Sequence, residues 1–443
     1  MFERFSTKEN ASMAMNMLNI FLYEIMFLAT LMMGYIHYFF YYSRGYLVFF
    51  LLYLFLYFIF AKLFDAFEVG NVTTTDLFLS TVLTLLLVNF TGYWILCLIT
   101  LRLIPAWPIL IMQIVEAFLT AFLLFLENRY IRRNFPPVKV VAIYGEEHYG
   151  LIGKLNNVRD LSMSVIRSID LKNLDYDKLD ELMEGADGLV TLDVHHENKK
   201  KLFKACYEKR ILIYDIPSIT DMLLASSDIL HIVDTPILKI NKYGPSEAEK
   251  IVKRAIDIFG SLFLIILTSP IMLLVAIAIK LQDGGDIFYS QTRLTKNGKE
   301  FKMVKFRSMI MNAEKKTGAV LAKENDERIT KVGKFIRKTR IDELPQLFNI
   351  LKGEMSFVGP RPERPEIYDE ICKDMPEFRF RLVVKAGLTG FAQIHGKYNT
   401  SLRDKLLLDL YYIENYSLIE DIKLLLLTLK IVFSKESTEG VKE

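Results

Sequence analysis

The hydrophobic positions in the first third of the chain form four long stretches with few charged residues. They lie at about Met17–Phe40, Tyr46–Phe67, Leu77–Leu98 and Leu103–Leu126. Each approaches the ~20 apolar residues that a helix needs to cross a bilayer. None has the charged start, short apolar core and small-residue cleavage site of a signal peptide. The pattern predicts an α-helical bundle of four membrane spans in residues 1–135.

Beyond Pro136-Pro137, short apolar runs alternate with segments of helical periodicity. The runs predicted to be strands are Val138–Tyr144, Ser164–Ile169, Gly188–Leu192, Ile211–Asp215 and Ile229–Val233. Strands that alternate with helices indicate a small, doubly wound, Rossmann-like α/β domain, expected over residues 136–242. Its first turn has Gly145, Gly150 and Gly153 instead of the Gly-x-Gly-x-x-Gly pattern of dinucleotide-binding domains. We therefore expect a structural role, or regulation by an unidentified ligand.

Residues 253–281 form a further apolar run, with Ser269 and Pro270 near its middle. Proline removes a backbone hydrogen bond and bends or breaks a helix, and basic residues flank both ends of this run. We expect a re-entrant helix-break-helix that enters and leaves one leaflet, turning at Ser269 and Pro270. The alternative is a kinked helix that crosses the membrane. The run belongs to a mainly α-helical C-terminal domain, expected over residues 243–443.

A later segment predicts a short amphipathic helix with acidic residues at its start. Its apolar positions recur at i, i+3, i+4 and i+7, at Leu344, Leu347, Phe348 and Leu351. Gly353 would end the helix, and Asp342 would be its N-cap, followed by Glu343. Taken alone, such a pair is an ordinary cap. The start of a helix also attracts phosphate, so the surroundings of the pair decide its role.

Composition and charge change this picture in two ways. A hydrophobic content of 52% is high for a soluble chain of 443 residues, which agrees with membrane spans. The formal net charge of +3 hides a concentration of Lys and Arg between Arg293 and Lys352. This concentration favours an anionic substrate or lipid headgroups, and no nucleic-acid partner is expected. A carboxylate among these cations should stay ionised and lie where phosphate is attracted.

The basic residues next to the predicted spans also indicate an orientation. Arg129, Arg132, Arg133 and Lys139 follow the fourth span, the strongest basic flank of the loops. By the positive-inside rule, the remainder of the chain then lies in the cytoplasm. The three cysteines, Cys97, Cys206 and Cys372, lack metal-binding or disulfide spacing, in keeping with a reducing compartment.

Six ordered motifs between about Lys253 and Phe433 resemble the bacterial sugar transferase family, the monotopic polyprenyl-phosphate phosphoglycosyltransferases. With the Ser269-Pro270 break, they are Lys253-Arg254…Asp257, Lys305-Phe306-Arg307-Ser308-Met309, Asp342-Glu343-Leu344-Pro345-Gln346, Ser356-Phe357-Val358-Gly359-Pro360-Arg361-Pro362 and Gly387-Leu388-Thr389-Gly390-Phe391-Ala392-Gln393. The four spans and the α/β domain resemble the large members of that family. These start exopolysaccharide, capsule or O-antigen repeat units, and the likeness to them implies a homodimer in the bacterial inner membrane.

The resemblance implies transfer of a sugar 1-phosphate from a UDP-sugar to undecaprenyl phosphate at the lipid bilayer, with release of UMP. Asp342 would be the nucleophile and would form an aspartyl-phosphosugar intermediate. Mg²⁺ is expected within reach of Asp342 and Glu343. The residues implied in binding phosphate or nucleotide are Arg361, Arg307, Arg340, Gln393 and Lys397. Where the family often has Asn-Gly-Arg after the glutamine, this chain has His395-Gly396-Lys397, and Lys lacks the bidentate fork of Arg.

Two other readings of the sequence compete with this one. The chain could be a non-catalytic membrane scaffold or nucleotide-sugar sensor that works through its α/β domain, in which case Asp342→Asn would leave its function intact. It could also be an ordinary glycosyltransferase that moves the sugar without its phosphate and so releases UDP. The nucleotide product separates these readings.

Overall fold

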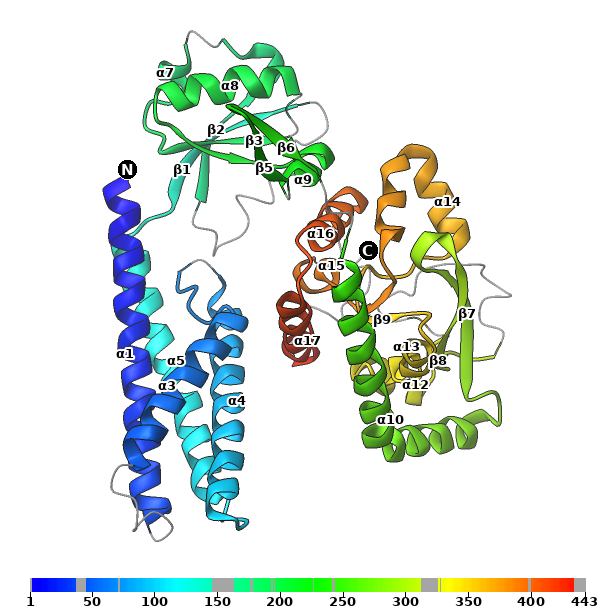
Figure 1. Ribbon diagram of the computed structural model, residues 1–443. Coiled ribbons are helices and arrows are strands. Elements are labelled where there is room, and N and C mark those ends of the chain that lie inside the picture. Colours follow the sequence, from blue (N-terminus) through cyan, green and yellow to red (C-terminus); the bar gives the residue numbers. More distant parts are fainter. Residues whose placement is uncertain are drawn as a thin grey trace. The chain divides into compact units, whose positions relative to one another are not determined.

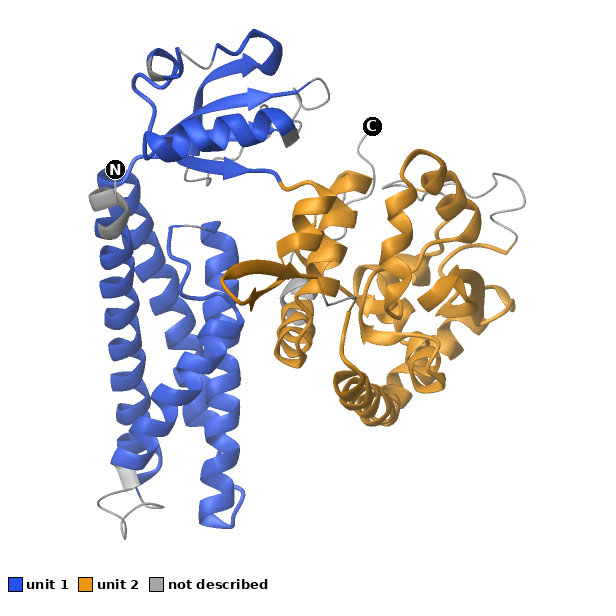
Figure 2. Cartoon of the chain, turned by 45° about the horizontal axis from the view of Figure 1, so that its top comes forward, with its two compact units in different colours: residues 1–216 blue, residues 217–443 orange. Residues whose placement is uncertain are grey.

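The computed structural model describes residues 2–36, 45–70, 72–145, 163–175, 178–192, 194, 196–225, 227–240, 244–311, 326, 328–396 and 400–433. The chain forms two compact units, Met1–Ile216 and Pro217–Glu443, and each is described by itself (Figure 2). The domain boundaries expected near residues 135 and 242 stay predictions.

The first unit begins with a helical bundle. Its helices are α1 (Phe2–Gly34), α3 (Gly45–Leu63), α4 (Thr74–Thr100) and α5 (Trp107–Asn134). Segments within α1, α4 and α5 are long and apolar enough to cross a membrane. The helix α3 has 19 residues and rises about 28 Å, close to the ~30 Å hydrocarbon core of a bilayer. The four apolar helices are those of a multi-pass membrane protein.

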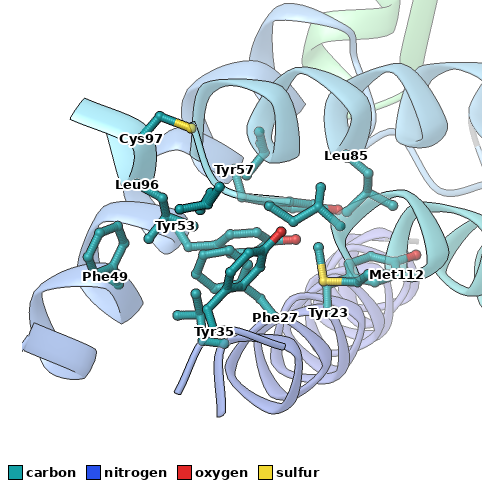
Figure 3. Packing of buried hydrophobic residues seen from close by; sticks show 14 of the residues in the cluster. Tyr23, Phe27, Tyr35, Phe49, Tyr53, Tyr57, Leu85, Leu96, Cys97 and Met112 are labelled. Carbon is teal, nitrogen blue, oxygen red and sulfur yellow. The ribbon is translucent and has the colours of Figure 1, made fainter. Parts of the chain in front are cut away.

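The bundle is packed by aromatic side chains and has buried polar groups at its centre. Phe27 and Tyr53 stack with ring centroids 4.2 Å apart, and Figure 3 shows their neighbours gathered between the helices. The carboxylate of Glu116 accepts hydrogen bonds from Tyr53 (3.2 Å) and Asn89 (2.6 Å). Phe118, by contrast, points outward and is 74% exposed. Polar groups inside and apolar side chains outside suit a lipid solvent.

The rest of the first unit is a parallel sheet. Its strands are β1 (Val138–Tyr144), β2 (Met163–Asp170), β3 (Gly188–Leu192) and β4 (Leu212–Asp215), in the order β2-β1-β3-β4. The short elements η1 (Leu171–Asn173) and α7 (Leu179–Leu182) and the helix α8 (His196–Glu208) follow β2 and β3. Helix α8 lies beside the sheet (Figure 1), and its Leu202 and Cys206 pack against Ile143 and Leu189. Four of the five predicted strands are therefore confirmed in one sheet.

The fifth predicted strand has a different partner. It forms β5 (Asp228–Ile232), which pairs antiparallel with β6 (Thr235–Lys239) as a separate hairpin of the second unit, after α9 (Ile219–Ala225). The prediction that it joins the α/β sheet was wrong. The short connection from β5 to β6 permits only an antiparallel hairpin, whereas a parallel neighbour needs a crossover of a dozen or more residues. Gly150 and Gly153 lie outside the described residues.

The helix α10 (Glu247–Asp283) is the long element of the second unit. A capping box of Ser246 and Glu249 starts it, and Gly284 in the left-handed conformation ends it. Helical structure continues through Pro270, so the predicted break is a bend within one helix (Figure 1). Pro270 has no N–H for the carbonyl of Ile266, and the Ser269 hydroxyl donates to that carbonyl instead (2.8 Å). Re-entrant insertion stays a prediction.

The second unit has further elements after α10, and they contact α10 both near its start and near its end. They are β7 (Phe288–Leu294), η2 (Lys296–Gly298), β8 (Glu300–Phe306), α12 (Lys331–Lys338), η3 (Ile341–Glu343), α13 (Gln346–Lys352), β9 (Ser356–Val358), α14 (Pro365–Asp374), η4 (Pro376–Val383), β10 (Gly387–Thr389), α15 (Phe391–His395), α16 (Leu402–Glu414) and α17 (Leu418–Phe433). The main core joins β8, α13, β9 and α16 through side chains such as Phe301, Leu347, Phe357 and Tyr412.

Candidate active site

The acidic pair lies in a tight turn and not at the start of the predicted helix. Asp342 and Glu343 belong to η3, and α13 begins only at Gln346, after Pro345. The prediction that Asp342 caps this helix was therefore wrong, whereas Gly353 ends α13 as predicted, with φ of 87°. The cause is packing: Ile341 and Leu344 pack against a cluster of apolar side chains from α10, β8 and α12, which holds the turn in its 3₁₀ form.

Buried contacts of α13 place strand β8 next to this turn. The Asn349 side chain accepts a hydrogen bond from the Val304 amide (3.1 Å) and donates to the Lys302 carbonyl (2.8 Å). Asn349 is 2% exposed, so these bonds form away from water, where their loss would be costly. They fix β8 relative to α13 and bring the next lysine of the strand, Lys305, to the acidic pair.

Glu343 is surrounded by three cations. Its Oε1 lies 3.1 Å from Lys305 Nζ, 3.7 Å from Arg361 Nη2 and 3.8 Å from Arg340 Nη1. Burial opposes ionisation of this carboxyl, but the attraction of Lys305, Arg361 and Arg340 is stronger and lowers its pKa to about 2. Glu343 therefore carries its charge at any physiological pH and holds the three cations around the site.

Asp342 has the opposite electrostatic balance. It is 9% exposed, and its Oδ1 is buried without a hydrogen-bond partner among the described residues. Burial, and next the neighbouring charge of Glu343, raise its pKa to about 6, although Lys305, Arg337 and Arg340 act in the other direction. The carboxylate is mostly ionised at pH 7. Its pKa is nevertheless closer to 7 than the concentration of nearby cations suggested. An ionised, poorly solvated oxygen of this kind is a competent nucleophile.

The other predicted site residues fall into two groups. Arg340 and Arg361 lie at the acidic pair, as above, and Gln393 lies in α15 with its amide nitrogen buried. Arg307 instead forms a two-pronged ion pair with Asp283 at the end of α10, and its Nε donates to the Asp286 carbonyl (2.6 Å). The structure thus gives Arg307 a structural contact away from Glu343. Lys397 lies outside the described residues.

Lys305 is a site residue that sequence reasoning did not select. The signal was present, because alternation along Phe301–Phe306 puts Phe301 and Met303 in the core and places Lys302 on the exposed face. Lys305 lies on the same side of the strand as Phe301 and Met303, and its side chain is only 20% exposed although it is charged. A lysine at a partly buried strand position needs an anionic partner, and here that partner is Glu343.

The motif of Lys253, Arg254 and Asp257 has a structural role. Arg254 donates to the carbonyls of Ile350 (2.7 Å) and Leu351 (2.8 Å) at the end of α13. The Asp257 carboxylate accepts from the backbone and side chain of the first residues of β9 at 3.0 Å, and Lys253 pairs with an acid of α17. These contacts attach α10 to the elements that carry the site.

The glycines of the last two motifs pack against one another. A Cβ added at Gly387 would lie 2.1 Å from the amide nitrogen of Gly359, and one at Gly390 would lie 2.2 Å from the Gly359 carbonyl oxygen. These positions need glycine because two backbone segments meet there. The packing joins the Gly359–Pro362 segment to β10.

The acidic pair fits a magnesium ion. Mg²⁺ prefers oxygen ligands and is commonly bound by one or two carboxylates together with substrate phosphates and water. Asp342 Oδ1, which has no hydrogen-bond partner among the described residues, and the carboxylate of Glu343 would supply those protein oxygens. In the part of the chain that the structure describes, no three His, Cys, Asp or Glu side chains form a complete protein cage. Mg²⁺ at this pair stays a prediction.

Known proteins resemble the second half of this chain. Residues 248–435 match the bacterial sugar transferase family. The chain is 37% identical over 238 residues to the UDP-N-acetylgalactosamine-undecaprenyl-phosphate N-acetylgalactosaminephosphotransferase of Aeromonas hydrophila, covering 53% of this chain and 55% of that protein. It is 35% identical over 237 residues to the undecaprenyl-phosphate galactose phosphotransferase of Salmonella typhimurium, covering 50% and 49%. The matches thus span about half the length of these two relatives.

A shorter relative is matched over nearly its whole length. The exopolysaccharide production protein PSS of Rhizobium leguminosarum bv. phaseoli is 38% identical over 186 residues, which are 40% of this chain but 92% of that protein. The family match over residues 248–435 contains nearly all of α10, the acidic pair and the glycine contacts.

Proposed function

Because this chain belongs to the bacterial sugar transferase family, we propose that it transfers a sugar 1-phosphate from a UDP-sugar to undecaprenyl phosphate and releases UMP. Two of the relatives named above are an undecaprenyl-phosphate galactose phosphotransferase and a UDP-N-acetylgalactosamine-undecaprenyl-phosphate N-acetylgalactosaminephosphotransferase. The product would be a lipid-linked sugar diphosphate, the first intermediate in building an exopolysaccharide, capsule or O-antigen unit. The observation that supports this proposal most directly is the buried Asp342 Oδ1 next to Glu343, which has three cations around it.

The proposed chemistry has two displacements at one phosphorus atom. Asp342 Oδ1 attacks the phosphorus nearer the sugar, an O–P bond forms, and the bond to the bridging oxygen breaks, so that UMP leaves with that oxygen. A phosphate oxygen of undecaprenyl phosphate then attacks the same phosphorus. The bond to Asp342 breaks, and the carboxylate is regenerated. Dividing the reaction in this way avoids a single direct displacement between two anions.

The surrounding cations do the electrostatic part of this chemistry. Phosphoryl transfer depends mainly on positioning and on neutralising charge on the phosphate oxygens. Arg361 is 47% exposed, so its guanidinium can bind a phosphate while Glu343 orients it. Lys305 lies deeper and neutralises Glu343, which keeps the pair of carboxylates from repelling the donor. Mg²⁺ held by Asp342 and Glu343 would add charge neutralisation at the diphosphate.

The proposed location follows from the helices and their flanks. The bundle and α10 would lie in the bacterial inner membrane, and the basic residues after α5 favour a cytoplasmic catalytic unit that meets soluble UDP-sugar. A homodimer is proposed from the resemblance to the large members of the family.

The decisive experiment identifies the nucleotide product. Purified protein in lipid nanodiscs is mixed with undecaprenyl phosphate, Mg²⁺ and a panel of UDP-sugars, and released nucleotides are separated. We expect UMP with the wild type and a loss of at least about 10³-fold with Asp342→Asn, which cannot attack phosphorus. Release of UDP would support an ordinary glycosyltransferase. Full activity of Asp342→Asn would remove this carboxylate from the mechanism.

A further inference from the structure

The short loop that carries Arg361 is bound at every one of its carbonyl groups. In the segment Pro360–Glu363, the Pro360 carbonyl accepts from the Gly387 amide (2.9 Å) and the Glu363 carbonyl accepts from the Leu294 amide (3.0 Å). Both donors lie outside the loop, in β10 and β7. The two ends of the loop are therefore attached to strands from distant parts of the sequence.

Two arginine side chains bind the carbonyls between these ends. Arg381 Nη2 donates to the Arg361 carbonyl and Arg293 Nη1 donates to the Pro362 carbonyl, each at 3.1 Å. Taking an arginine out of water to bind a backbone carbonyl has a large desolvation penalty, because its charge must also be compensated. This cost indicates that the conformation of the loop matters.

Each of the two arginines is itself fixed by a second partner. Arg381 Nε donates to Asp409 Oδ2 at 2.7 Å, and the two side chains are only 6% and 2% exposed. The Arg381 guanidinium also lies 4.5 Å from the ring centroid of Phe378. Arg293 Nη2 donates to Gln291 Oε1 at 2.6 Å. Among the described residues, neither arginine contacts Asp342 or Glu343. An effect of either arginine on the chemistry therefore passes through the loop.

We infer that Arg293 and Arg381, the latter supported by Asp409, are positioning residues that hold the Pro360–Glu363 loop so that Arg361 points at the acidic pair. The side chain of Arg361 is half exposed and is 3.7 Å from Glu343, so little in its own packing would order it. A fixed backbone supplies that order before the substrate binds, which lowers the cost of orienting the guanidinium in the transition state. This inference rests on the proposed function for its kinetic consequence.

The first test measures the loop itself and needs no activity. Arg293→Lys and Arg381→Lys keep the charges but cannot bind both partners at once. In the full-length protein in nanodiscs, hydrogen exchange of the peptide over residues 359–364 should become at least tenfold faster in the double variant. Arg379→Lys, a change at an exposed arginine of the same η4, should leave that exchange as in the wild type. Unchanged exchange in the double variant would overturn the inference.

The second test is a kinetic cycle with Arg361. The double variant should lower kcat for UMP release by roughly 10- to 100-fold while KM for the UDP-sugar changes by less than about threefold. In an Arg361→Ala background, the same two substitutions should lower kcat further by less than about twofold, because they act only through Arg361. An equal loss in both backgrounds would show that the arginines act elsewhere and would overturn the positioning role. If the wild type released no UMP, the proposed function would fail, while the exchange measurement would still decide whether the loop is held.

Discussion

At the scale of single residues, two adjacent carboxyl groups are given different tasks by their surroundings. Glu343 faces Lys305, Arg340 and Arg361 and has a pKa of about 2. Asp342 is buried without a hydrogen bond to Oδ1 from any described residue and has a pKa of about 6. Environments that separate the pKa values of two neighbouring groups are typical of active sites. The first carboxyl organises cations, and the second is left available to react.

The pKa of Asp342 predicts the pH dependence of the first displacement. The attacking carboxylate must be ionised and its pKa is raised, so kcat/KM should fall as the pH decreases through about 6, approaching tenfold per pH unit below it. Glu343 stays ionised over this range because its pKa is lowered.

Initial rates of UMP release between about pH 5 and 8 would measure this fall of kcat/KM at low pH. Raising the Mg²⁺ concentration should move the midpoint of the fall to lower pH, because a bound cation favours the ionised carboxylate. A profile that is flat across this range at low Mg²⁺ would contradict the assignment of Asp342 as the nucleophile.

At the scale of elements, backbone contacts bring distant motifs together. β9 pairs in parallel with β10. Glycines at the ends of these strands let the two backbone segments meet at distances that no Cβ would allow. Arg254 and Asp257 attach α10 to α13 and β9 by hydrogen bonds to their backbone. Motifs that look like binding segments in the sequence are therefore partly the means by which the site is assembled.

A comparison of two glycine substitutions tests this packing. Gly387→Ala would place a methyl group 2.1 Å from a backbone nitrogen and should cost about 3 kcal/mol of unfolding free energy. Gly284→Ala, at a left-handed position with open space around it, should cost about 1 kcal/mol. Thermal unfolding of the full-length variants in nanodiscs would show the difference. Equal effects would contradict close packing as the reason for glycine at position 387.

At the scale of the whole molecule, a catalytic unit is combined with helices that suit a bilayer. The bundle turns aromatic side chains outward, and α10 exposes apolar side chains such as Phe259, Phe263 and Leu274. One substrate of the proposed reaction is soluble and the other is a lipid, so the acidic pair has to lie at the membrane surface. The bend of α10 is the feature that would permit this.

Labelling at the two ends of α10 tests this arrangement. The three native cysteines are buried, so cysteines introduced at Glu247 and Asp286 can be followed with low background. Both positions should react from the cytoplasmic face if the helix re-enters one leaflet. The reagent would be a maleimide that does not cross membranes, applied to inverted and right-side-out vesicles. Reaction from opposite faces would show that α10 crosses the membrane.

The sequence by itself determined the features that depend on local composition and period. Apolar stretches of helical length located the bundle, alternating runs located β1 to β4, Gly353 marked the end of α13, and Pro270 marked the bend of α10. These follow from neighbouring residues along the chain and from solvent preference, so no long-range contact is needed to infer them. The motifs likewise placed Asp342 and Glu343 at the centre of the proposed chemistry.

Only the tertiary structure decided which side chains meet. Packing of Ile341 and Leu344 turned an expected helix cap into a 3₁₀ turn, and the contacts of Asn349 brought Lys305 to Glu343. The same packing set Arg307 against Asp283. Burial and distance determine which carboxyl is stabilised as an anion, and both depend on residues that are far apart in the chain. That is why a concentration of charge indicated an anion site but not the separate roles within it.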